Sequence, residues 1–151
     1  MRNQRIVYHQ DMKKYDKIIY LLTVKMTTYV IASKANQPYL AECQMLGENL
    51  MENSPDICIK CVIKDNSEWD EFVDSVCRTY GFTKKTCPIV YTLEGNLIGD
   101  GKDFVLYAKE RYGRSVQIEK DSLKARVALN EEQNFDRMKK LREGETLGEK
   151  I

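Results

Sequence analysis

The sequence predicts a single α/β domain whose elements follow the order β-α-β-α-β-β-α. Short apolar runs rich in β-branched residues, typical of buried strands, alternate with segments whose apolar residues recur at helical spacing. Proline, glycine and asparagine stand between these segments, where the chain has to turn. The regular part of this pattern begins at Met26.

The first strand is predicted at residues 28–32, followed by a helix that begins near Pro38, since proline fits the first turn of a helix. A turn at residues 53–55 ends this helix, and residues 57–63 form the second strand. The apolar face of the helix consists of Leu40, Cys43, Leu46, Leu50 and Met51.

A second helix is expected from Asn66-Ser67 to a stop at Gly81. The third strand covers residues 88–91, and a short hairpin leads to the fourth at residues 97–99. Asp103 is expected to cap a third helix that runs over residues 104–112 and ends at Gly113. The apolar face of the second helix consists of Trp69, Phe72, Val73, Val76 and Tyr80.

The two ends differ from the domain at residues 26–113. Residues 1–25 form a basic N-terminal arm, with six Lys or Arg against two Asp or Glu. Residues 114–151 form a charged helical C-terminal tail, in which residues 130–133 indicate a capping box that restarts the helix. The tail has a sparse apolar stripe that we expect to bind a partner: Leu123, Val127, Phe135, Met138 and Leu141.

Composition excludes several classes of protein. A net charge of +1 over 151 residues argues against a dedicated nucleic-acid binder. No secretory signal or membrane-spanning run is recognised, and five cysteines without framework spacing indicate free thiols in a reducing, cytoplasmic compartment. The single histidine, His9, has no partners at ligand spacing, so no metal site is predicted.

Residues 33–40 read Ser-Lys-Ala-Asn-Gln-Pro-Tyr-Leu, between the first strand and its helix. This segment resembles the glutaredoxin motif S-K-x-x-C-P-Y-C, with Gln37 and Leu40 in place of both redox cysteines. The resemblance implies a thioredoxin-like fold of the glutaredoxin type. Those enzymes attack disulfides with a thiolate held at a helix N-terminus, so the replacements predict a protein without oxidoreductase activity.

Other parts of the glutaredoxin site are retained. Residues 86–88 resemble the T-V-P segment with its cis proline, and residues 98–104 resemble the I-G-G-x-x-D-L segment that binds glutathione. Asp100 departs from this pattern by adding charge and bulk. The resemblance implies a vestigial glutathione site of Lys34, Pro38, Tyr39, Cys87, Pro88, Gly99 and Asp103. Alternatively, Pro88, Gly99 and Asp103 only maintain the strand entry, turn and helix cap.

The remaining cysteines give two further expectations. Cys58 and Cys61 spell C-x-x-C, but residues three apart on a strand point to opposite faces and cannot pair or share a metal. We therefore expect them to be core residues. Cys87 is expected to be partly exposed, with Lys84 and Lys85 close enough to favour its thiolate.

A closer resemblance covers about residues 26–130. The matching segments are the run from Met26 to Ala32, Pro38-Tyr39, Trp69, Pro88 to Val90, Leu97 to Gly99 and Tyr112-Gly113. Together they resemble the N-terminal domain of the putative malate dehydrogenase 1B family. In that family a glutaredoxin-like domain precedes a malate-dehydrogenase-like domain, and the proteins are associated with cilia and sperm flagella.

We therefore expect a redox-inactive structural or adaptor protein, without cofactor, that docks onto a large assembly. The resemblance implies a ciliary axoneme, with protein partners rather than nucleic acid or membrane. The alternative is a glutathione-binding protein or residual thiol oxidoreductase that uses Cys87. A third possibility is a fragment of a longer dehydrogenase-type protein.

Overall fold

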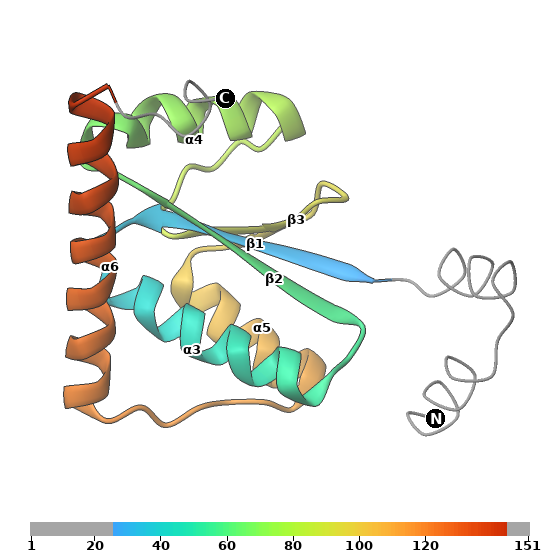
Figure 1. Ribbon diagram of the computed structural model, residues 1–151. Coiled ribbons are helices and arrows are strands. Elements are labelled where there is room, and N and C mark those ends of the chain that lie inside the picture. Colours follow the sequence, from blue (N-terminus) through green and yellow to red (C-terminus); the bar gives the residue numbers. More distant parts are fainter. Residues whose placement is uncertain (1–25, 145–151) are drawn as a thin grey trace, which may run out of the picture.

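A four-stranded mixed sheet forms the centre of the computed structural model, which describes residues 26–144 (Figure 1). The predicted basic arm, His9 and the last seven residues lie outside the described residues. The strands lie in the order β2-β1-β3-β4. β1 (Thr27–Lys34) pairs in parallel with β2 (Ile57–Lys64) and antiparallel with β3 (Ile89–Thr92), which pairs antiparallel with β4 (Leu97–Gly99).

Helices cover both faces of this sheet. α3 (Pro38–Asn53) and α5 (Gly101–Tyr112) pack on one face, and α4 (Asn66–Tyr80) packs on the other. With these helices the chain follows the predicted order β-α-β-α-β-β-α, and the strand order is that of the thioredoxin-like fold. The predicted fold class is therefore confirmed.

A further helix, α6 (Lys120–Arg142), stands beside the carboxyl ends of β1 and β2. In Figure 1 it runs along one side of the molecule, passes the first turns of α3 and reaches the start of α4. The chain reaches it through an extended segment that follows Gly113, the left-handed C-cap of α5. None of the helices between residues 26 and 144 is both long and apolar enough to cross a membrane.

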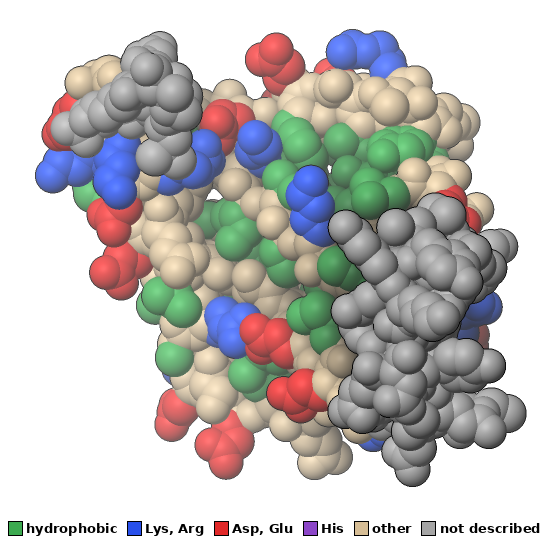
Figure 2. Space-filling model, turned by 45° about the vertical axis from the view of Figure 1, so that its right-hand side comes forward, with side chains coloured by type: hydrophobic (Ala, Val, Ile, Leu, Met, Phe, Trp, Pro, Cys, Tyr) green, Lys and Arg blue, Asp and Glu red, His purple; other side chains and the backbone are tan. Residues whose placement is uncertain are grey.

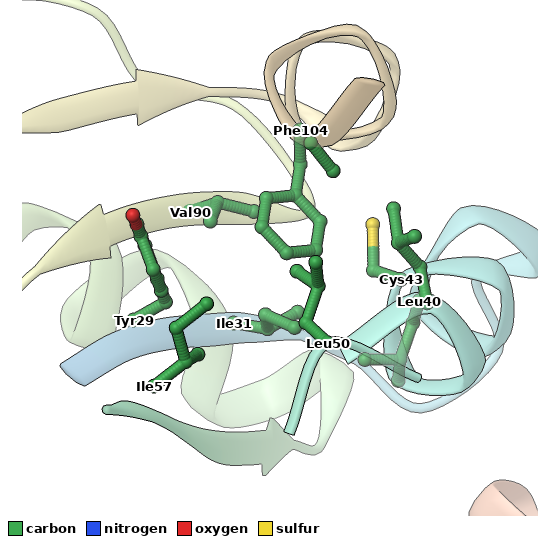
Figure 3. Packing of buried hydrophobic residues seen from close by; sticks show 10 residues of the cluster. Tyr29, Ile31, Leu40, Cys43, Leu50, Ile57, Val90 and Phe104 are labelled. Carbon is green, nitrogen blue, oxygen red and sulfur yellow. The ribbon is translucent and has the colours of Figure 1, made fainter. Parts of the chain in front are cut away.

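The centre of β1 is buried on both faces, because successive side chains of a strand point to opposite sides. Residues 29–32 are at most 1% exposed. Tyr29 and Ile31 join the core beneath α3 and α5, as Figure 3 shows, whereas Val30 and Ala32 join the core beneath α4. One strand therefore supplies both hydrophobic cores.

Local capping chemistry sets the ends of α4 and α5. The N-cap of α4 is Asp65, which forms a reciprocal capping box with Glu68. The N-cap of α5 is Asp100, in a second box with Asp103, so the expectation that Asp103 is itself the cap was wrong. Asp103 is the third residue of the helix, and its carboxylate accepts from the Asp100 backbone amide.

Burial differs from the prediction at three residues. Cys58 and Cys61 are exposed rather than in the core, because β2 is an edge strand and nothing among the described residues pairs with its outer side. Met51 is also exposed, although the adjacent Leu50 is fully buried, because the two side chains point to different sides of α3. The predicted restart at residues 130–133 was wrong as well, since α6 continues through them.

Three tyrosines close the end of the sheet where β1 begins. The buried Tyr29 hydroxyl is 3.0 Å from that of Tyr107 and 2.6 Å from that of Tyr112. A buried phenol requires such partners, because an unpaired polar group is costly away from water. The hydrogen bonds join β1 to the last turns of α5.

We expect Phe104→Ala to lower the free energy of unfolding by about 3–5 kcal/mol, because it leaves a cavity between α5 and the sheet. Phe104 is 0% exposed, whereas Leu106 on the same helix is 55% exposed. The matched variant Leu106→Ala should change stability by about 0.5 kcal/mol or less. Urea denaturation followed by circular dichroism measures both, and equal effects would contradict this packing.

Candidate functional site

The first turn of α3 occupies the position of a glutaredoxin nucleophile. Gln37 is the N-cap in extended conformation, with φ −91° and ψ 122°, and Pro38 follows as the first helical residue. The Gln37 side chain makes no capping hydrogen bond, and the first turn contains no acidic residue. A neutral amide therefore stands where such an enzyme holds a thiolate, and the positive end of the helix dipole is left uncompensated.

Leu40, which replaces the second redox cysteine, is a core residue. It is fully buried and belongs to the same cluster as Cys43 and Phe104 (Figure 3). Cys43 is the thiol of α3 itself, and its Sγ lies 3.8 Å from the carbonyl oxygen of Gly101. Burial raises the pKa of the Cys43 thiol to about 12, so it is protonated and inert at neutral pH.

Cys87 lies beside the end of β1, half-buried. Its sulfur accepts a hydrogen bond from the Lys34 backbone amide at 3.4 Å and lies 3.5 Å from the Ser33 hydroxyl. The Cys87–Pro88 peptide bond is cis, as predicted. Lys85 forms an ion pair with Asp74 on α4, so at least one of the two lysines expected to favour the thiolate is engaged elsewhere.

Three residues form the turn and the helix cap at the start of α5: Gly99, Asp100 and Asp103. The amides of Asp100 and Asp103 each donate to the other residue's carboxylate at 2.9 Å. Hydrogen bonding from the Asp103 amide holds the pKa of Asp100 below its usual range. Gly99 has φ +133°, and a Cβ there would lie 2.1 Å from Asp103 Oδ2, so only glycine fits. These contacts support the turn and cap interpretation, and glutathione binding stays a prediction.

Tyr39 joins the first turns of α3 and α5. A Cβ on Gly101 would lie 2.8 Å from the Cβ of Tyr39, so the glycine allows the two helices to meet. The Lys102 ammonium lies 5.9 Å from the centre of the Tyr39 ring. The predicted site residues thus form two groups, one around Cys87 at the end of β1 and one around the N-terminus of α5.

The inner face of α6 forms an interface that was not predicted from the sequence. Asn130 and Gln44 are both buried and exchange two side-chain hydrogen bonds, of 2.8 and 3.2 Å. Since Asn130 is only 2% exposed, this reciprocal pairing is what permits its burial. On one side of this pair Arg126 binds the carboxylate of Glu48 at 2.9 Å, which continues the contact with α3.

The second half of this interface reaches the capping box of α4. Asn134 donates to Asp65 at 2.9 Å, and Arg137 donates to Glu68 at 2.5 Å. We call these pairs, with Arg126–Glu48 and Asn130–Gln44, the α6 interface. Its four α6 residues recur at spacings of four, four and three, a helical polar stripe that could have been recognised in the sequence.

The docking of α6 partly buries some residues of the predicted apolar stripe of the tail and leaves others exposed. Leu123, Val127 and Met138 are half-buried, whereas Phe135 is 61% exposed and Leu141 is also exposed. Three residues of the stripe are thus partly covered within the chain itself, because polar side chains fasten α6 to α3 and α4. Phe135 and Leu141 remain as exposed apolar groups, and their binding to a partner stays a prediction.

Hydrogen bonds lower the pKa of two of the three carboxylates that α6 contacts, Asp65 and Glu68. Donation by Ser67 lowers the pKa of Asp65 to about 2, and Asn134 adds to this effect. Donation by Arg137 lowers the pKa of Glu68.

Among residues 26–144, no group of three or more His, Cys, Asp or Glu side chains is placed to hold a metal ion.

The model of the putative malate dehydrogenase 1B N-terminal domain family matches residues 28–147. The chain belongs to this family. It is 29% identical over 111 residues to putative malate dehydrogenase 1B of Branchiostoma floridae, and 27% identical over 109 residues to that of Bos taurus. These matches cover 70% and 68% of this chain but only 21% and 23% of the relatives, so the chain spans about a fifth of their length.

The family match continues through α6, beyond the seven elements of the thioredoxin-like core. Among solved structures, reduced Escherichia coli glutaredoxin is similar, with 21% identity and a TM-score of 0.46 over 58% of this chain and 99% of that one. The chain is therefore a domain of the malate dehydrogenase 1B N-terminal type.

The lowered pKa values predict that acid loosens α6. The ordinary pKa values are 3.8 for Asp65 and 4.5 for Glu68. Above these values the ionised carboxylates stabilise docking, Glu68 mainly through Arg137 and Asp65 only in part through Asn134, since Ser67 lowers its pKa most. This stabilisation is lost as the pH falls through the depressed folded-state values, toward about 2 for Asp65. The stability of the double variant Asn134→Ala/Arg137→Ala should fall less steeply with pH over this range than that of the unmodified chain. Thermal unfolding at several pH values measures this.

Lys85→Ala provides the control, because it removes an ion pair that does not involve α6. Its pH dependence should follow that of the unmodified chain. An unchanged pH profile in the double variant would show that these contacts do not stabilise the docked helix.

Proposed function

We propose that this chain is a redox-inactive docking domain that binds protein partners within a large assembly, the ciliary axoneme. The observation that carries the proposal is the pair Gln37 and Leu40 at the first turn of α3. A dithiol exchange needs a nucleophilic thiolate and a resolving thiol, and these two side chains supply neither. The fold around this position is nevertheless intact.

The exposed apolar surface in the second half of α6 supports the docking part of the proposal. Phe135 and Leu141 are exposed, although burying a large apolar side chain contributes about 1.5–3 kcal/mol. Their helix is held in place by the α6 interface, so this surface is presented in a defined orientation. Preorganised apolar groups of this kind are suited to binding another protein.

The family supports the axonemal part of the proposal. This chain belongs to the family, and the resemblance described above associates such proteins with cilia and sperm flagella. The named relatives are putative malate dehydrogenases, but the matched segment is the glutaredoxin-like part of those longer proteins. Dehydrogenase chemistry is therefore no part of the proposed function.

Phe135→Ser should reduce co-purification of the full-length chain with axonemal material at least several-fold, because it removes the single aromatic side chain of α6, which is exposed. The matched control is Leu129→Ser, since Leu129 is 45% exposed on the same helix but does not line the surface around Phe135. Quantitative mass spectrometry of tagged protein from ciliated cells measures both. Absence of the unmodified chain from axonemes would exclude the proposal.

A residual thiol activity is the second candidate, and the position of Cys87 favours it. The sulfur is half-buried beside the cis proline and accepts a hydrogen bond from the Lys34 amide. Hydrogen bonding to sulfur can stabilise a thiolate, the reactive form in disulfide exchange. The two candidates differ in whether the chain reduces a glutathione mixed disulfide.

We expect the unmodified chain to show no reduction of a glutathione mixed disulfide above the Cys87→Ser background. Gln37→Cys should introduce measurable activity, because a thiol at the N-terminus of α3 lies where the helix dipole stabilises a thiolate. A coupled glutathione reductase assay measures all three proteins. Activity in the unmodified chain that Cys87→Ser abolishes would favour the thiol enzyme over the docking domain.

A further inference from the structure

Between α3 and the segment that leads to α6 lies a groove of about 350 Å³, here called the α3 groove. One wall is a single face of α3, with residues at helical spacing: Met45, Glu48, Asn49 and Glu52. The other wall consists of residues 116–119 and of Ser122 at the start of α6. In Figure 1 this second segment runs along the lower edge of the molecule. A group bound in the α3 groove therefore contacts both α3 and the approach to α6.

The charged residues that line the α3 groove are all acidic: Glu48, Glu52 and Glu119. Glu48 is paired with Arg126, but among the described residues Glu52 and Glu119 form no ion pair. α3 as a whole contains three glutamates and no basic residue. Figure 2 shows mainly acidic side chains at the lower left of the molecule, whereas Lys and Arg gather at the upper left. Two carboxylates of the groove are therefore available to a cation.

The C-terminal end of α3 adds to this negative potential. Its last turn contains no basic residue, although the carbonyl groups there form the negative end of the helix dipole. The Asn53 side chain donates to the Asn49 carbonyl oxygen at 2.8 Å, but it carries no charge. Glu52 lies in the same turn, so carboxylate and dipole act together. Positive charge is favoured at this end of the groove, and a polyanion is disfavoured.

The α3 groove also presents apolar surface. Met45, Val116 and Ile118 line it and are half-buried. Val116 packs against the core beneath α3 and α5, so this wall is held in place from the inside. Covering these side chains would remove further apolar surface from water. The groove is thus suited to an apolar segment that carries positive charges at its ends.

The chain contains a segment of this kind close to the groove. Residues 18–24 read Ile-Ile-Tyr-Leu-Leu-Thr-Val, with Lys17 before them and Lys25 after them. The Thr27 amide donates to the carbonyl oxygen of Asp56 at 2.9 Å, and Asp56 is the third residue after α3. Two residues separate Lys25 from Thr27, a distance that covalent geometry limits to about 7 Å. The segment therefore joins β1 beside the C-terminal end of α3.

We propose that residues 17–25 of the chain's own N-terminal arm bind in the α3 groove. The two lysines of this segment face the carboxylates of Glu52 and Glu119, and the apolar run between them covers the three apolar side chains of the groove. Covalent attachment gives this segment a higher effective concentration than a separate basic peptide would have. The bound arm joins α3 to the approach to α6 and so supports the docked position of that helix.

Carbodiimide crosslinking of the purified full-length chain tests this contact, because the reagent joins a lysine amine to a carboxylate that lies against it. After digestion, mass spectrometry should find Lys17 or Lys25 joined to Glu52 or Glu119 several-fold more often than to the exposed carboxylates of residues 70–71 on α4. The crosslinked chain should run as a monomer. A crosslinked dimer would assign the groove to the arm of a second copy and would overturn the inference.

Charge reversal provides a second, independent measurement. Glu52→Lys/Glu119→Lys should speed tryptic cleavage after Lys17 and Lys25 several-fold, because repulsion releases the arm. The matched control Asp70→Lys/Glu71→Lys makes the same change of charge on α4 and should be cleaved there as the unmodified chain is. Added salt should speed cleavage of the unmodified chain, because it screens exposed charges.

Equal cleavage of the two charge-reversed variants would contradict the proposed contact. Protection of the arm that appears only after addition of axonemal extract would assign the groove to a separate partner and would also overturn the inference. Neither result bears on the proposed docking function, which depends on the second half of α6.

Discussion

The burial of β1 on both faces is the constraint on which the rest of the structure depends. Its central residues serve two cores at once, and it is hydrogen-bonded to a parallel neighbour and to an antiparallel one. Full burial of each large apolar side chain contributes about 1.5–3 kcal/mol, so the position of this strand is strongly determined. The end of β1 in turn holds the sulfur of Cys87, which directly precedes the cis proline, through the Lys34 amide.

The replacements in the first turn of α3 change what the fold offers to a partner. Leu40 replaces the second redox cysteine of the motif and lies in the core, where it packs with Cys43 and Phe104. Gln37 leaves the positive end of the helix without a negative charge of the chain's own. The same dipole that stabilises a thiolate in an enzyme is thus free to act on an anionic group from outside.

The docking of α6 depends on polar contacts more than on apolar ones. Individual hydrogen bonds contribute only about 0.5–1.5 kcal/mol, but a buried amide left without its partner is costly. The reciprocal pairing of Asn130 with Gln44 therefore fixes the position of α6 along α3. Because this interface is mainly polar, the apolar Phe135 and Leu141 remain on the surface, where a partner could bury them.

The sequence by itself determined the features that depend on near neighbours. Apolar periodicity and the turn residues located every strand and helix of the core, and the resemblance to glutaredoxins identified Gln37, Leu40 and the cis Pro88. Boundary details such as the cap of α5 were less certain, because Asp100 and Asp103 form a reciprocal box in which either one is suited to capping.

Only the tertiary structure decided the features that depend on distant partners. The strand order places β2 at an edge and exposes Cys58 and Cys61, which its local apolar pattern had indicated as buried. Asn130 fits a helix restart locally, but its partner Gln44 lies 86 residues away, and their contact makes it part of a continuous, docked helix. Local sequence records what a segment can form, whereas burial and charge pairing depend on which segment lies against it.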